Sequence, residues 1–151
     1  MFHRFRYESK FAATLDRLPL YVRMKLDVTG IKLSLQDWLA FGFEERQAIC
    51  HLPVENEEEQ EAFTAYLDFL CRKYFDRAIA TLAPVNASLW ESSRVPEAVA
   101  ERTSRGVRSV TPQEWSRWQF HERYALYKTA ISKSEPEKFY AVLAELRERT
   151  A

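Results

Sequence analysis

Histidine and cysteine side chains are the first candidates for chemistry in this chain, because they serve as nucleophiles, bases and metal ligands. The 151-residue chain has three histidines and two cysteines: His3, His51, His121, Cys50 and Cys71. No two histidines lie four residues apart, so the helical zinc site that this spacing provides is excluded. Cys50 and His51 are adjacent, so on a helix their side chains diverge by about 100°, which does not suit a nucleophile–base pair. We predict ordinary helix-end residues and buried, reduced thiols.

Loops that bind phosphate or calcium are not predicted either. The three glycines, Gly30, Gly42 and Gly106, are isolated, whereas phosphate-binding loops need clustered glycines. The acidic run from Glu55 to Glu61 lacks the alternating ligands and the glycine of a calcium loop, and is typical of a solvated helix start. We expect no metal and no cofactor and predict no catalytic residue. Enzyme activity stays open, since catalytic groups can come from distant positions.

Basic side chains form two groups that could bind an anion or an acidic partner. Arg23 and Lys25 make the first group, and Arg102, Arg105 and Arg108 make the second. The alternative is a solvated helix face, because surface charges are common and weak in effect.

Aromatic residues are abundant, with four tryptophans, seven tyrosines and ten phenylalanines. Exposed aromatic and arginine side chains anchor protein interfaces. We expect Trp38 and Trp115 in the core and take Trp90 and Trp118 as candidates for a partner-binding surface. Core filling is the alternative for these two residues, because aromatic side chains are mostly buried. Under that alternative, Leu89 and Trp90 hold their segment against the core.

Composition and charge limit the class of protein. The 22 basic and 22 acidic residues balance, which argues against a nucleic-acid binder. No stretch approaches the roughly 18 apolar residues that span a bilayer, and the first residues do not resemble a signal peptide. We expect a cytoplasmic protein that forms one domain over residues 1–151.

Helix signals follow one another along the chain. Pro19 opens a helix that ends before Gly30, and Ser34-Leu-Gln-Asp37 is a capping box. A further helix is expected at about 43–51. The clearest helix begins at Asn56 and is expected to run to Leu82, with an apolar stripe at helical spacing. Residues 2–8 could form a short strand or arm.

The second half repeats this order of signals. Helices are expected at about 96–105, after Thr111, at 120–130 and after Ser134. Shifting the chain by 77 residues aligns Pro19 with Pro96, Trp38 with Trp115 and Arg46 with Arg123, and Gly30 with Gly106 after a one-residue slip. We predict an all-α domain of seven to nine helices, built from two pseudo-repeated three-helix units, at about 18–53 and 95–130, around a long linking helix at 56–82.

The same residues resemble a known family. The segments Phe5-Arg-Tyr-Glu-Ser-Lys-Phe11, Leu18-Pro-Leu-Tyr-Val-Arg-Met-Lys-Leu-Asp27 and Gly30-Ile-Lys-Leu-Ser-Leu-Gln-Asp-Trp38 are similar to the nitrate reductase associated protein family. Further matches are Val95-Pro-Glu-Ala-Val99, Gln113-Glu-Trp115 and Arg123-Tyr-Ala-Leu126. The resemblance covers nearly the whole chain and keeps Arg23, Lys25, Gly30, Trp38 and Arg46.

This resemblance implies an accessory role in nitrate assimilation, without an established catalytic residue set. The chain departs from the family pattern at Val54, where a cysteine usually follows the proline, so chemistry that depends on that cysteine is not expected here.

Two functional hypotheses follow. The first is a non-catalytic protein that binds nitrate reductase or a molybdenum-cofactor-related maturation protein, with a homodimer left open. The second is a small-molecule or anion-binding domain, with uncharacterised enzyme activity, whose site includes Arg23, Lys25, Arg102 and Arg105.

Overall fold

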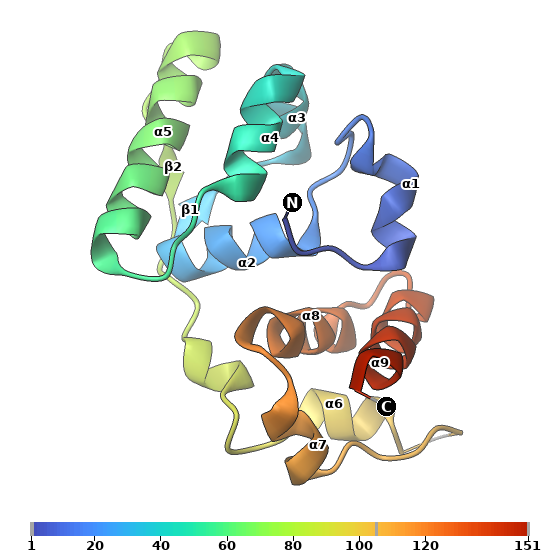
Figure 1. Ribbon diagram of the computed structural model, residues 1–151. Helices are drawn as coiled ribbons and strands as arrows, with labels where there is room; N and C mark the ends of the chain where they lie inside the picture. Colours follow the sequence, from blue (N-terminus) through green and yellow to red (C-terminus); the bar gives the residue numbers. More distant parts are fainter. Residues whose placement is uncertain (1, 105, 151) are drawn as a thin grey trace. The chain divides into compact units, whose positions relative to one another are not determined.

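The computed structural model describes residues 2–104 and 106–150 (Figure 1). This part of the chain contains nine α-helices, two 3-10 helices and one two-stranded sheet, which confirms the predicted all-α class and the predicted number of helices. The chain forms two compact units. Unit 1 consists of the described residues up to Arg4 and of Glu8–Asn86, and unit 2 consists of Phe5–Tyr7 and the described residues from Ala87 onward.

The elements of unit 1 are drawn in blue to green in Figure 1. They are α1 (Ser9–Ala12), α2 (Leu20–Thr29), β1 (Ile31–Lys32), α3 (Leu35–Ala40), α4 (Phe43–His51), α5 (Glu57–Phe75) and β2 (Ala80–Thr81). The 3-10 helix η1 (Arg6–Glu8) precedes them, so the strand expected within residues 2–8 is not formed.

The elements of unit 2 continue in yellow to red. They are η2 (Ala87–Trp90), α6 (Glu97–Arg102), α7 (Pro112–Arg117), α8 (Phe120–Ile131) and α9 (Glu137–Thr150). Helix α8 packs against α6, α9 and η2 and is therefore the centre of this unit. No helix in the described residues is long and apolar enough to cross a membrane.

Three predicted helix starts are confirmed by side-chain caps. The Ser34 hydroxyl accepts the amide of Asp37, and the Asp37 carboxylate accepts the amide of Ser34, which completes the capping box of α3. Asn56 caps α5 and Thr111 caps α7 in the same way through the amide three residues on. These short side chains satisfy amides that have no partner inside the helix.

The predicted helix over 56–82 is too long. Helix α5 ends at Phe75, because Asp76 takes a left-handed conformation with φ 53° and caps the helix through its amide. Residues 80–81 then pair antiparallel with β1, Ile31 opposite Thr81 and Lys32 opposite Ala80. The apolar stripe of α5 could not reveal this, because the turn depends on a single residue outside it.

Gly30 permits this strand pairing. It caps α2 with φ 72°, a conformation that costs a residue with a Cβ atom more than glycine. A Cβ atom at this position would lie 2.5 Å from the Leu82 carbonyl oxygen, and the Leu82 amide donates to the Gly30 carbonyl at 2.8 Å. Glycine is therefore required both by the conformation and by the close approach of the second strand.

A tryptophan and an arginine bind loop carbonyls in unit 1. The Trp38 indole N–H donates to the Leu15 carbonyl at 2.7 Å. The Arg46 guanidinium donates to the carbonyls of Thr14, Leu15 and Phe41 at 2.9 to 3.1 Å. Together they fix the loop before α2 and the turn between α3 and α4.

Unit 2 contains the corresponding contacts. The Trp115 indole N–H donates to the Glu91 carbonyl at 2.6 Å, and Arg123 donates to the carbonyls of Trp90 and Trp118. Trp115 and Arg123 are the residues that the 77-residue shift aligns with Trp38 and Arg46. A duplicated unit would keep such contacts. The duplication itself stays a prediction.

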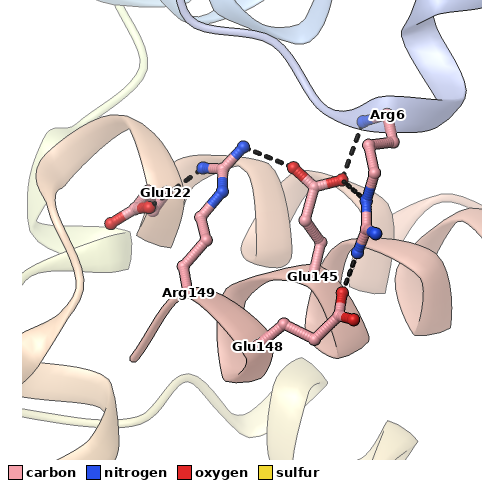
Figure 2. A network of polar contacts seen from close by, with 5 residues as sticks. All are labelled: Arg6, Glu122, Glu145, Glu148 and Arg149. Carbon is pink, nitrogen blue, oxygen red and sulfur yellow. Dashed lines mark hydrogen bonds and ion pairs between the residues drawn. The ribbon is translucent and has the colours of Figure 1, made fainter. Parts of the chain in front are cut away.

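Charged side chains hold the N-terminal segment of unit 2 against α9 (Figure 2). The carboxylate of Glu145, which is only 6% exposed, accepts the backbone amide of Arg6 at 2.7 Å and its Nε at 3.3 Å. Arg6 also pairs with Glu148, and Arg149 bridges Glu145 and Glu122. The buried Glu145 is the central acceptor, since exposed pairs alone contribute little.

Lys25 is fully buried and closes the end of α4. Its ammonium donates to the carbonyls of Ile49, Cys50 and Leu52 at 2.5, 3.1 and 2.7 Å, and it lies 4.8 Å from the centre of the Tyr21 ring. Burial lowers the pKa of Lys25 to about 8 and raises the pKa of the Cys50 thiol to about 12. The three carbonyls are the last acceptors of a helix and need donors.

The two tryptophans of the α7 segment should differ in their contribution to stability. The Trp115 indole N–H has an acceptor, whereas the equally buried Trp118 indole N–H has none among the described residues. Both changes to phenylalanine remove the same volume, so Trp115→Phe should lower the free energy of unfolding by about 1–3 kcal/mol more than Trp118→Phe. Urea unfolding followed by circular dichroism measures both free energies of unfolding. Equal losses in the two variants would mean that the Trp115 hydrogen bond does not add to stability.

Stability should depend on pH through Lys25. The unfolded lysine keeps its proton up to its ordinary pKa of 10.5, while the folded one releases it near 8, so its deprotonation stabilises the fold as pH rises. The free energy of unfolding of wild type minus that of Lys25→Met should therefore rise by about 1 kcal/mol from pH 8 to pH 9. Urea titrations at each pH test this.

Cys50 has the opposite effect, because its raised pKa lowers stability above pH 9 in both proteins. The comparison with Lys25→Met cancels this contribution to first order. A difference that stays constant from pH 7 to pH 10 would mean that the folded lysine keeps its proton.

Candidate functional site

The two tryptophans predicted to lie on a partner-binding surface are buried. Trp90 is 0% and Trp118 is 2% exposed, so the expectation that they are exposed is wrong. Trp90 packs against rings of α8. The Trp118 ring meets the Trp115 ring edge-on, with ring centres 6.2 Å apart. Large aromatic surfaces are more stable inside the fold than in water, and a binding role for either residue must act through a neighbour.

The predicted basic groups have different environments. The Lys25 ammonium is occupied by three carbonyls, and Arg102 donates to the carbonyls of Ala130 and Ser132 at the end of α8. Both side chains therefore cap helices. The three carbonyls use the whole Lys25 ammonium, whereas the two bonds of the half-buried Arg102 use only part of its five N–H donors. Arg23 is exposed and has no partner among the described residues, and Arg105 lies outside the described residues.

The residues predicted to be structural occupy turns and caps. Pro19 and Pro96 precede α2 and α6 as their N-caps rather than standing inside the first turn. Gly106 has φ 80° in the exposed segment after α6, which ends at Arg102 rather than at residue 105. The remaining members of this set are Gly30, Trp38, Arg46, Trp115 and Arg123, whose contacts are given above.

A concave surface in unit 2 is the strongest candidate for a binding site. This η2–α8 hollow has a volume of about 450 Å³, within the range of roughly 300–1,000 Å³ that ligand pockets occupy. It lies between η2, the start of α6 and the end of α8. Its lining residues are Ser88, Leu89, Arg94, Val95, Pro96, Glu97, Ala98, Tyr127 and Ile131.

Apolar side chains on opposite sides of the hollow are exposed to solvent. Leu89 of η2 and Ile131 of α8 are each 45% exposed, and Val95 and Pro96 add half-buried apolar surface between them. The prediction that Leu89 packs into the core beside Trp90 is wrong, since only Trp90 does. Successive residues of a 3-10 helix point in different directions, so burial of one leaves the other outside.

Aromatic packing fixes the wall formed by Tyr127. Its ring stacks on the buried Trp90 ring with centres 5.9 Å apart and an interplanar angle of 29°. Tyr124 and Phe120, from the same face of α8, contact Trp90 at 5.0 and 5.6 Å. Trp90 therefore supports the hollow from behind, which is the only way in which it could contribute to binding.

One positive charge on the lining has no partner. The exposed Arg94 makes no hydrogen bond or ion pair with any described residue. Glu97 is the first residue of α6, where the helix dipole favours a negative charge. Arg94 is therefore available to a carboxylate or another anion, and the apolar lining is available to a large side chain.

Sequence reasoning did not identify Arg94, Tyr127 and Ile131. Tyr127 and Ile131 follow Phe120 and Tyr124 at positions seven and eleven residues after Phe120, which places all four on one helix face. That pattern was readable from the sequence. What it could not show is that the face continues beyond Trp90 into solvent.

The hollow contains features of recognition rather than of a metal centre. No group of three or more histidine, cysteine, aspartate or glutamate side chains is arranged to hold a metal ion in the described residues. Tyrosine, arginine and branched apolar residues are typical of interface centres.

Comparison with known proteins gives one family. No curated protein and no solved structure matches the chain. The family model described as "Conserved nitrate reductase-associated protein" matches residues 4–146, which covers nearly the whole chain and includes both units. The match agrees with the resemblance seen in the sequence segments around Trp38 and Trp115, and the chain belongs to the conserved nitrate reductase-associated protein family.

Proposed function

We propose that this protein is a non-catalytic accessory protein of nitrate assimilation, which binds nitrate reductase or a molybdenum-cofactor-related maturation protein through the η2–α8 hollow. The family description supports the association with nitrate reductase. The observation that supports the surface is a hollow that combines two exposed aliphatic side chains, a supported tyrosine and an arginine without a partner among the described residues.

Physical considerations favour this surface over the others predicted from the sequence. An interface centre needs side chains that lose water on binding and that are already held in place. Tyr127 is held by Trp90, so its ring loses little conformational freedom when a partner covers it. The Lys25 ammonium, in contrast, would have to give up a carbonyl before binding anything else, and Arg102 is held in place at the end of α8 by two carbonyls.

The second hypothesis, a small-molecule or anion-binding domain, also points to this hollow. The site predicted for it from the sequence included Lys25, whose three donors are occupied, and Arg102, whose guanidinium is held by two carbonyls at the end of α8. Arg94 offers a guanidinium beside apolar surface instead, with no partner in the described part of the chain. Under this hypothesis a free small anion, such as nitrate or a metabolite carboxylate, would raise the melting temperature of wild type but not of Arg94→Gln.

Affinity capture should distinguish the accessory role. Tagged wild-type protein is expected to recover nitrate reductase, or a protein that matures it, from nitrate-grown host cells. The double variant Leu89→Gln with Ile131→Gln should recover at least about tenfold less, since two apolar side chains at an interface centre are lost. Mass spectrometry and a nitrate reductase assay on the eluate measure the difference.

The matched control is Val107→Gln, which changes a 38%-exposed valine outside the hollow lining. It should recover as much partner as wild type. Recovery of no nitrate-assimilation protein by wild type would count against the proposed function, and equal recovery by the double variant would exclude the hollow as its surface.

A further inference from the structure

The chemistry of the η2–α8 hollow restricts what can occupy it. Six of the residues that line it present apolar or aromatic surface: Leu89, Val95, Pro96, Ala98, Tyr127 and Ile131. Arg94 is the single cationic residue of the described lining, and its charge has no partner within the described chain. An occupant must therefore offer an apolar group and, near it, a negative charge.

We propose that the occupant is a peptide segment of the partner protein in which a large aliphatic or aromatic side chain lies close to an aspartate or glutamate. The apolar side chain enters the hollow between Leu89 and Ile131, and the carboxylate pairs with Arg94. This inference rests on the proposed function, because it names the part of a partner that the same surface recognises.

Charge complementarity is the first support. A guanidinium binds a carboxylate through parallel N–H donors, which gives both strength and orientation. Glu97 lines the same hollow and repels a carboxylate placed near it, so the acidic group must lie on the Arg94 side. The position of the acid relative to the apolar side chain is therefore restricted.

Size is the second support. A volume of about 450 Å³ is sufficient for a few side chains of one segment but not for a folded element. Leu89 and Ile131 are both 45% exposed, and covering them removes apolar surface from water, which favours binding. A small anion without an apolar part would leave this surface in water.

Selection from peptides displayed on phage tests the proposal even while the partner is unidentified. The full-length protein is the bait, and the library is random in sequence. Wild type should enrich peptides in which a leucine, isoleucine, methionine or phenylalanine is within a few residues of an aspartate or glutamate. The charge-reversed Arg94→Glu should lose this acidic preference, and circular dichroism should show an unchanged fold, since Arg94 has no partner to lose among the described residues.

A double-mutant cycle then locates the contact. One enriched peptide, labelled with a fluorophore, is compared with its acid-to-amide variant by fluorescence anisotropy. Arg94→Gln and the amide peptide should each weaken binding at least about tenfold, and together no more than either alone. Arg117→Gln is the matched control, because Arg117 is also exposed and unpartnered within the described chain but lies outside the hollow lining.

Absence of enrichment, or enrichment that is the same on Arg94→Glu, would overturn the proposal, and so would additive losses in the cycle. An effect of free nitrate or acetate without any peptide selectivity would also overturn it in favour of a small-ligand site. If peptides behave as expected while affinity capture recovers no nitrate reductase, the hollow keeps its specificity and only the proposed partner is wrong.

Discussion

The binding of loop carbonyls by Trp115 and Arg123 is the interaction on which the hollow depends. Trp115 binds the Glu91 carbonyl and Arg123 binds the Trp90 carbonyl, so two adjacent peptide groups are held from two helices. Both bonds are partly buried, so a lost donor leaves its carbonyl acceptor less well satisfied than in the fold. These bonds fix η2, and η2 places Leu89 at the edge of the hollow and Trp90 behind Tyr127.

Unit 1 uses the same pair of side chains for a different result. Trp38 and Arg46 hold the carbonyls of Thr14 and Leu15, and the loop they hold contributes Leu15 to a continuous buried core. By the 77-residue shift Arg17 corresponds to Arg94, and each is an exposed arginine two residues before the proline that caps the next helix.

The sequence predicted the elements that depend on local signals. The predicted caps at Ser34, Asn56 and Thr111 were confirmed, because a helix start is decided by a few neighbouring residues. The end of α5 was not predicted, because the helix stops at the left-handed Asp76, which lies outside the apolar stripe, and the residues after it pair with the distant β1. The same distinction applies to the site, since Trp90 reads as a candidate anchor until its neighbours on α8 are known.

Whether a charged side chain is paired was the least predictable property. Arg23, Lys25, Arg94 and Arg102 are all basic residues within or just before short helices. The Lys25 and Arg102 side chains cap the ends of α4 and α8, whereas Arg23 and Arg94 have no side-chain partner among the described residues. The difference depends on whether a helix ends within reach of the side chain, which requires the packing of α2 on α4 and of α6 on α8. Sequence alone assigns the charge but not whether it is paired.

The contact between Gly30 and Leu82 has a consequence for how unit 1 is assembled. The hydrogen bond from Leu82 to Gly30 and the two residue pairs beside it join the ends of the segment that carries α3, α4 and α5. Closing so long a loop costs conformational entropy that a pairing of two residues does not repay. The closure must therefore be stabilised by the core that the loop itself brings together, which makes this two-stranded sheet an outcome of helix packing rather than its cause.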